Sequence, residues 1–162
     1  MNHRDEIFQG DGIRNLPVIN LPDTTIKSVS SIILSNTCDI DQQNKRSYQN
    51  MVTYAPILSL KKFIDRVTIN FGNTTANNLL KTIKEQKITS ILYLPANGVI
   101  EDSIIFLDRI NNCSIDVLKA EEVHSNKLFV LSDFGLYLLL LKLSIHFCRI
   151  KERVDRFQGQ IL

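Results

Sequence analysis

Residues 32–60 read IILSNTCDIDQQNKRSYQNMVTYAPILSL, and they place two strand-like runs on either side of a polar loop. The first run, residues 29–34, is short and rich in β-branched side chains, which favours a buried strand. The second run, residues 51–57, has the same character and carries Pro56 near its end. This strand–loop–strand unit begins the β core that we expect to span residues 29–131.

The rest of the core is predicted from shorter signals. Short runs rich in β-branched residues favour further strands, and helically spaced apolar positions favour two short helices. The strands are expected at residues 88–94, 103–110, 115–118 and 128–131. The helices are expected at residues 58–66 and after Thr74 or Thr75, because either threonine is a good N-cap residue.

The N-terminal segment, residues 1–28, contains residues that interrupt regular structure. These residues are Gly10, Gly12, Pro17 and Pro22. We therefore expect an irregular segment with one short strand near residues 16–19. No linker is long enough to divide the chain, and 162 residues fit one domain of ordinary size. The sequence predicts a single α+β domain, residues 1–162, with short helices inserted in an antiparallel sheet or barrel.

The C-terminal segment carries a sustained periodic signal. Ser132 or Asp133 can cap an amphipathic helix over residues 132–157, and Gly159 lies just beyond its expected end. Apolar residues repeat with heptad spacing at Leu136, Leu140, Leu143, Phe147, Ile150, Val154 and Phe157. Two interpretations are open. The whole seam packs on the chain's own sheet, or its second half pairs with a partner helix, such as the same helix in a homodimer.

A second stripe on the same predicted helix is basic. It comprises Lys142, His146, Arg149, Arg153 and Arg156. Helical periodicity places these side chains on one narrow face. Two interpretations are open for this stripe. It is a solvated face, in which cations near the helix C-terminus are stabilised by the helix dipole, or it is a surface that binds phosphate groups or an acidic partner.

Bulk composition limits the functional classes. The net charge is +2, so any contact with nucleic acid must come from a local basic patch. The first residues are polar and acidic and lack the apolar stretch of a signal peptide, and the three cysteines form no metal-binding or paired spacing. The apolar run 134–148 is shorter than the roughly 20 residues of a membrane-spanning helix. We expect a cytoplasmic protein with no membrane contact.

The segment that begins the β core resembles the PemK/MazF toxin family. That family shows a strand ending in Ser-Asn, a polar loop, and a strand ending in Ala-Pro. Here residues 32–36 read IILSN and residues 52–57 read VTYAPI. Residues 102–109 resemble the family's next core strand more weakly, and the family also ends in a helix.

The resemblance implies an SH3-like barrel that dimerises and, in many members, an endoribonuclease that needs no metal ion. The family's catalytic arginine precedes the first of these strands, and its position falls on Val29 here. The family's threonine after the second strand falls near Leu58 or Ser59, so Ser59 supplies a candidate hydroxyl.

The polar loop offers groups for RNA cleavage without a metal ion, which needs a base, an acid and cations beside the phosphate. Asp39 or Asp41 could act as the base, while Lys45 and Arg46 could contact phosphate. The catalytic candidates are Thr37, Asp39, Arg46 and Ser59. The candidates for nucleic-acid binding are Ser35, Asn36, Lys45, Lys61, Lys62, Arg149 and Arg153. An ordinary structured loop and scattered solubility lysines are the alternatives, and we predict no metal ion and no cofactor.

Two hypotheses about function therefore remain. In the first, the chain is a divergent MazF-like barrel protein, an RNA-cleaving or RNA-binding toxin or defence component. In the second, it is a non-enzymatic interaction module that docks a partner protein through its C-terminal helix. The expected partners are RNA, a cognate antitoxin or effector protein, and a second copy of the chain in a homodimer.

Overall fold

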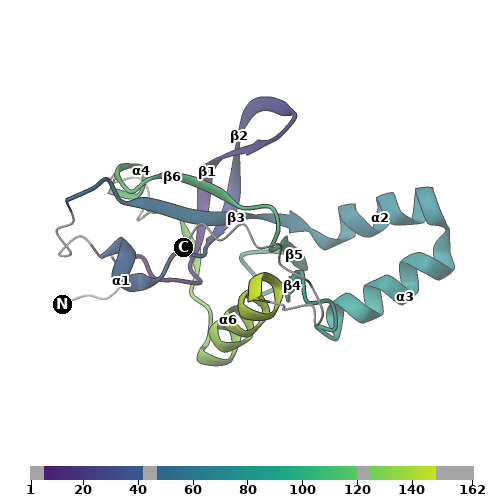
Figure 1. Cartoon of the computed structure of the whole chain (residues 1–162). Coiled ribbons are helices and arrows are strands. Elements are labelled where there is room, and N and C mark those ends of the chain that lie inside the picture. Colours follow the sequence, from purple (N-terminus) through teal and green to yellow (C-terminus); the bar gives the residue numbers. More distant parts are fainter. Residues whose placement is uncertain (1–5, 42–46, 120–124, 149–162) are drawn as a thin grey trace, which may run out of the picture.

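The computed structural model describes residues 6–41, 47–119 and 125–148, and it shows an α+β protein built on an antiparallel sheet (Figure 1). The strands are β1 (Gly12–Asn20), β2 (Asp23–Ile33), β3 (Met51–Ser59), β4 (Ile91–Leu94), β5 (Ser103–Phe106), β6 (Asn111–Ser114) and β7 (Lys127–Phe129). The described helices are α1 (Thr37–Ile40), α2 (Leu60–Phe71), α3 (Asn73–Lys84), α4 (Asp116–Lys119) and α6 (Asp133–Cys148).

The strand β3 lies at the centre of the sheet. Tyr54 pairs with Ile33 of β2 on one edge and with Asn111 of β6 on the other, and the end of β3 then pairs with β5. The strand order is β4-β5-β3-β2-β1-β7, with β6 beside β3. The strands β4 and β7 lie at opposite ends of this order, and no ladder between the described strands joins them. The closed SH3-like barrel that we expected is therefore not confirmed.

The short strand that we expected near residues 16–19 lies within β1, but most of residues 12–28, which we expected to be irregular, belong to the long hairpin of β1 and β2 that rises from the sheet in Figure 1. A register shift between Ile13 and Leu16 explains the error. Asn15 has a φ of 61° within this bulge, and both flanking apolar side chains are buried although they are three residues apart. The bulge hides the alternation of period two by which a strand is recognised in a sequence.

The two strands that frame the polar loop are confirmed, because residues 29–34 and 51–57 lie in or beside β2 and β3. The strands β4 and β5 form within the expected runs but are shorter, and β7 overlaps the run expected at residues 128–131. The strand expected at residues 115–118 is wrong, since these residues fall largely in α4. Ser114 Oγ accepts a hydrogen bond from the Asp116 N–H at 3.2 Å, and such a local bond favours a turn over a sheet ladder.

The helices α2 and α3 form a hairpin that projects from the body of the protein (Figure 1). Its base packs on β4 and β5 through an apolar cluster that includes Leu60 and Ile83. The helix α3 begins directly after Gly72, whose φ of 84° suits glycine. The caps that we expected at Thr74 or Thr75 were therefore wrong, because both lie inside the first turn of α3.

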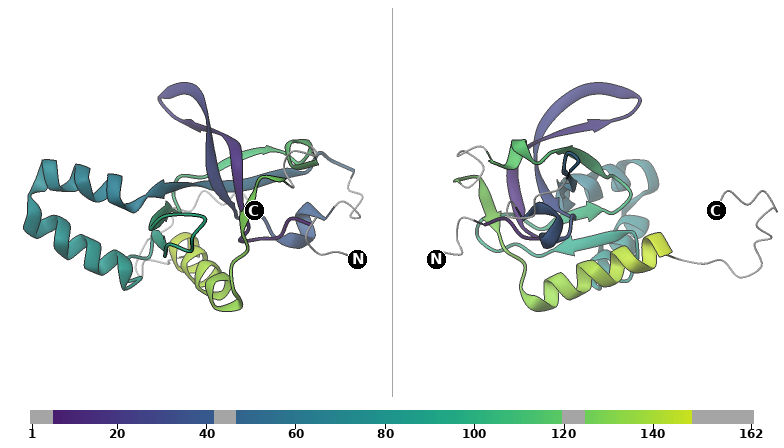
Figure 2. Two further views of the ribbon diagram at one scale, coloured as in Figure 1. Left: turned by 180° about the vertical axis from the view of Figure 1, so that it is seen from behind. Right: turned by 60° about the vertical axis from the view of Figure 1, so that its left-hand side comes forward.

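The helix α6 lies across one side of the sheet, and no other described element lies beyond it (Figures 1 and 2). Leu139 is fully buried and joins a core cluster with Leu92, Leu94 and Ile105. Leu136 and Leu143 of the expected heptad seam pack beside this cluster, but Leu140 and Phe147 are exposed. The remaining seam members lie outside the described residues, so a helix extending to residue 157 is not confirmed.

Candidate protein-interaction site

The outer face of α6 is apolar although it is exposed. Eight outward residues form it, and we call them the outer face: Phe134, Tyr137, Leu140, Leu141, Ser144, Ile145, Phe147 and Cys148. Their large apolar members are between 41% and 73% exposed. Apart from Asp133 at the first position, no exposed residue of α6 is charged. Contiguous exposed apolar patches are common at interaction sites, which makes this face a candidate site.

The inner side of α6 carries the charged residue that its outer face lacks. Lys142 is only 4% exposed, and its Nζ donates hydrogen bonds to the backbone carbonyls of Gln86 (2.9 Å), Ile88 (2.6 Å) and Ile91 (2.7 Å). These bonds use all three donors of the ammonium group. Burial lowers the pKa of Lys142 from its ordinary value. The lysine thus fixes which side of α6 faces the sheet.

This position of Lys142 corrects the predicted basic stripe. Neither the solvated face nor the phosphate-following surface applies to a lysine whose ammonium group is buried against carbonyl groups. His146 is half-buried, and its ring contacts Phe147 edge-on at 4.8 Å between centroids. The other predicted members, Arg149, Arg153 and Arg156, lie outside the described residues.

The edge strand β4, which α6 covers, has no free hydrogen-bonding groups on its outer side. The side chain of Gln86 accepts from the Tyr93 N–H at 3.1 Å and donates to the Tyr93 carbonyl at 2.7 Å. The Ile91 carbonyl accepts from Lys142, and the Ile91 N–H donates to the Ile88 carbonyl at 3.3 Å. Because the edge is satisfied, a partner cannot add a strand here and has to contact side chains.

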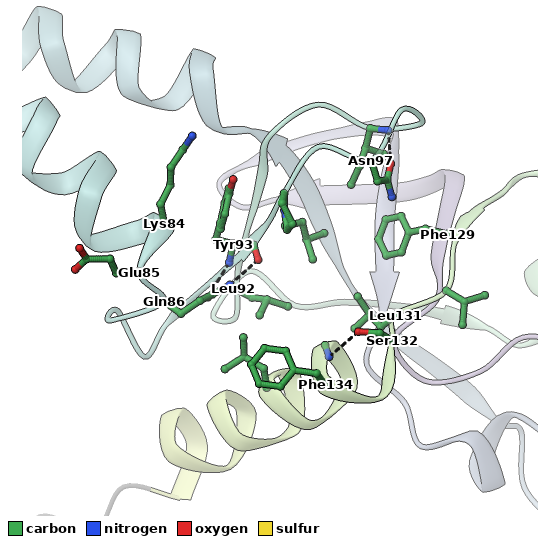
Figure 3. A pocket seen from close by; sticks show the side chains of 16 residues that line it. Lys84, Glu85, Gln86, Leu92, Tyr93, Asn97, Phe129, Leu131, Ser132 and Phe134 are labelled. Carbon is green, nitrogen blue, oxygen red and sulfur yellow. Dashed lines mark hydrogen bonds between the residues drawn. The ribbon is translucent and has the colours of Figure 1, made fainter.

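A pocket of about 620 Å³ opens beside the first turn of α6 (Figure 3). Its walls come from the end of α3, from β4, from the loop that follows β4, and from the junction between β7 and α6. In Figure 3, Tyr93 lines one side and Phe129 the other, with Phe134 on α6. Phe134 also belongs to the outer face, so the pocket and the outer face form one continuous surface.

The polar groups of this pocket are occupied by contacts within the chain. The Gln86 amide is paired with Tyr93, and Asn97 Oδ1 accepts from the N–H groups of Val99 and Ile100 at 3.0 Å. Ser132 Oγ accepts from the Gly135 N–H at 3.2 Å. The pocket therefore offers mainly apolar contact to an occupant.

At the rim of the pocket, Asp102 connects three elements. Its carboxylate accepts hydrogen bonds from Lys84 Nζ (2.8 Å), the Tyr93 hydroxyl (2.9 Å) and the Ala96 N–H (3.0 Å). The bond from Lys84, followed by those from Ala96 and Tyr93, lowers the pKa of Asp102 to about 2. Lys84 is thus neutralised by its partner and gives the pocket no unpaired cation.

Three predicted residues of the polar loop have structural contacts. Ser35 Oγ accepts from the Thr53 N–H at 2.8 Å, and Asn36 Oδ1 accepts from the Cys38 N–H at 2.9 Å and so caps α1. Thr37 Oγ1 accepts from the Gln9 N–H at 3.1 Å. These bonds explain why the loop needs such residue types, and they do not require a catalytic role.

Among the catalytic candidates that the structure describes, Thr37 and Asp39 lie together in α1, and Ser59 lies apart from them. Thr37 and Asp39 lie in α1 near one end of β3, whereas Ser59 caps α2 at the other end (Figure 1). The Thr53 N–H donates to Ser35, which lies just before α1, and the strand from Thr53 to Ser59 spans roughly 20 Å. The predicted residues Lys45, Arg46, Arg149 and Arg153 lie outside the described part of the chain.

Ion pairs engage several lysines of the described residues, among them one predicted nucleic-acid-binding residue, Lys61. Lys61 contacts Asp65 at 2.7 Å, next to the exposed Lys62 at the start of α2. Further pairs join Lys27 to Asp23, Lys84 to Asp102, Lys87 to Glu85, and Lys127 to Asp11. A paired lysine attracts phosphate less strongly, so Lys61 is a weaker candidate for nucleic-acid binding than the sequence suggested.

The buried ion pair of Asp11 and Lys127 was not predicted. Asp11 is fully buried, and its Oδ2 accepts from Lys127 Nζ at 2.7 Å and from the Phe8 N–H at 2.9 Å. The pair joins the segment before β1 to β7. In the sequence, the position of Asp11 between two glycines could have indicated its structural role. For Lys142, the corresponding indication was a lone lysine in an apolar run.

Comparison with known proteins identifies no relative, since no family model and no curated protein sequence matches the chain. Within the described residues, no helix is both long enough and apolar enough to cross a membrane. The same residues contain no group of three or more His, Cys, Asp or Glu side chains placed to hold a metal ion. The site is therefore defined by its own geometry.

Proposed function

We propose that this chain is a non-enzymatic protein-interaction module that docks a second copy of itself through the outer face of α6. The observation that carries the proposal is the charge-free outer face opposite the buried Lys142. An apolar surface without charged groups resembles a domain core cut in half, which is typical of permanent homodimers. A surface for an unlike, transient partner is usually more polar.

The scaffold is a divergent, open relative of the SH3-like barrel in the PemK/MazF family. Three features support this part of the proposal: the adjacent strands β2 and β3, in which Ile32 lies opposite Ala55; the polar segment between them; and the helix α6 that follows the last described strand. In this proposal the protein acts in the cytoplasm, and a cognate antitoxin or effector protein binds the dimer.

Analytical ultracentrifugation across a concentration series tests the interaction. The wild-type chain is expected to sediment as a dimer, and Leu141→Glu as a monomer, because the substitution places a charge in the middle of the outer face. Ile69→Glu is a matched control, since Ile69 is exposed at the far end of α2 and is distant from α6. A wild-type chain that stays monomeric at every concentration contradicts the proposal.

RNA cleavage is the second candidate function, and the MazF-like arrangement of β2, its polar loop and β3 favours it. Induced expression in a bacterial host, with growth and total RNA followed together, tests this function. Growth arrest with RNA decay in the wild type, lost in an Asp39→Ala/Arg46→Ala double variant, supports a ribonuclease. Purified protein that leaves a pool of single-stranded RNA intact in EDTA argues against it.

A further inference from the structure

We infer that the two copies of α6 pack antiparallel and cross at Leu141, so that the last turn of the partner's helix covers the pocket beside Phe134. This inference rests on the proposed function and specifies the geometry of the same surface. Four observations carry it: the spacing of the outer face, the sizes of its residues, the position of Asp133 at the start of α6, and the continuity of the outer face with the pocket.

The centre of the outer face has the spacing of a helix–helix contact. Phe134, Tyr137, Leu141, Ser144 and Cys148 follow one another at intervals of three, four, three and four residues. All five are exposed, and they point away from the buried Leu139 and Lys142. Such alternation keeps a continuous line of side chains directed at a neighbouring helix.

The sizes of these side chains decide the direction of the partner helix. The N-terminal half of the line is aromatic, whereas its C-terminal half is small, with Ser144 and Cys148. An antiparallel pair centred on Leu141 places Phe134 opposite Cys148 of the partner subunit, and Tyr137 opposite Ile145 of the partner subunit and next to Ser144 of the partner subunit. Phe134 then meets a small residue and Tyr137 borders one, which favours close packing. A parallel pair would set aromatic rings against each other and leave gaps at the small residues.

Electrostatics favour the same direction. Asp133 is the charged residue at the exposed start of α6, and a parallel pair would place two copies of it side by side. In an antiparallel pair the two aspartates lie at opposite ends.

The pocket supplies an independent reason for a covering element at this end of the helix. Phe134 is 73% exposed and lines the pocket, whose polar groups are occupied within the chain. An apolar occupant therefore fits best. The antiparallel arrangement brings Phe147 and Cys148 of the partner subunit to this position, so the pocket is closed only in the dimer.

Disulfide trapping tests the direction of packing, because two cysteines join only when their Cα atoms lie within about 7 Å. A Phe134→Cys variant is prepared in a Cys38→Ser background and oxidised mildly. We expect a covalent dimer through the native Cys148 of the other copy, and its loss when Cys148→Ser is added. Without Phe134→Cys, the two Cys148 residues lie roughly 20 Å apart along antiparallel helices, so no covalent dimer is expected.

Phe71→Cys is the matched control, because Phe71 is exposed to a similar degree at the tip of α2. It is expected to give no covalent dimer.

A covalent dimer through two Cys148 residues indicates parallel helices and overturns this inference while the proposed dimer remains. The same conclusion follows if Phe134→Cys still gives a covalent dimer after Cys148→Ser is added, because the two introduced thiols have then joined each other. A dimer by ultracentrifugation that no pair traps also overturns the inference. A monomer contradicts the inference and the proposed function together.

Discussion

Lys142 Nζ lies 2.7 Å from the Ile91 carbonyl oxygen, where α6 crosses the edge of the sheet. The contact explains why a charged residue of α6 faces the sheet while the solvent side of the helix is apolar. Burying an ammonium group is costly unless all of its donors are satisfied, and here three carbonyl groups accept from it. Because this lysine faces the sheet, the apolar residues on the opposite side of the helix face solvent, and they form the surface that we propose as the dimer contact.

Replacing Lys142 with methionine is expected to destabilise the fold. The substitution keeps the apolar length of the side chain but leaves the three carbonyl groups without their donor, which costs about 1–3 kcal/mol. Unfolding in urea, followed by circular dichroism, measures the change. Lys62→Met is the control, since Lys62 is exposed on α2 and its loss should change stability by less than about 0.5 kcal/mol. Equal stabilities of Lys142→Met and wild type would contradict the anchoring role.

The sequence predicted the parts of the fold that depend on local pattern. The strands around the polar loop were found from their β-branched runs. Ser59 was predicted as a candidate catalytic hydroxyl, and the structure shows it as the N-cap of α2. The orientation of α6 was not predictable from periodicity. Nearly every residue from Phe134 to Cys148 is apolar, so several stripes fit equally well, and the choice depends on contacts of Lys142 with residues more than fifty positions away.

The candidate site was missed for the same reason. Gln86 looks like an ordinary polar residue at the end of a helix, and only the fold places its amide against Tyr93. The polar loop was predicted to hold catalytic residues because its residue types suit catalysis. The same types also suit capping and turn formation, and Ser35, Asn36 and Thr37 have contacts of that kind.

Acid is expected to weaken the rim of the pocket through Asp102. Its pKa is about 2 in the folded protein and 3.8 as a free group, so the folded state favours the ionised form. The stability that Asp102 contributes is therefore complete above about pH 4 and is lost as the pH falls towards 2. We expect Asp102→Asn to be less stable than wild type at neutral pH, with the difference shrinking in acid. Urea unfolding at several pH values measures this, and a difference independent of pH would contradict it. The exposed Asp108→Asn is the control.

Removing the side chain of Gln86 is expected to open the edge of β4. Gln86→Ala removes both hydrogen bonds to Tyr93, and two such bonds together contribute about 1–3 kcal/mol. Hydrogen exchange gives the local readout, because the Tyr93 N–H loses its acceptor and should exchange faster than in the wild type. Gln49→Ala removes an exposed side chain that bonds Ser114 and should leave Tyr93 unchanged. Unaltered protection of the Tyr93 N–H in Gln86→Ala would show that α6 alone shields this edge.

Breaking the buried pair of Asp11 and Lys127 is expected to have the largest effect on stability. Lys127→Met leaves the fully buried carboxylate without its cation, and such an uncompensated charge costs about 3–5 kcal/mol. Asp11→Asn combined with Lys127→Met removes both charges and should recover part of this loss. The four proteins of the cycle are compared by unfolding in urea. If the double variant loses at least as much stability as the two single variants together, the pair does not act as a unit. Each residue would then contribute through other contacts.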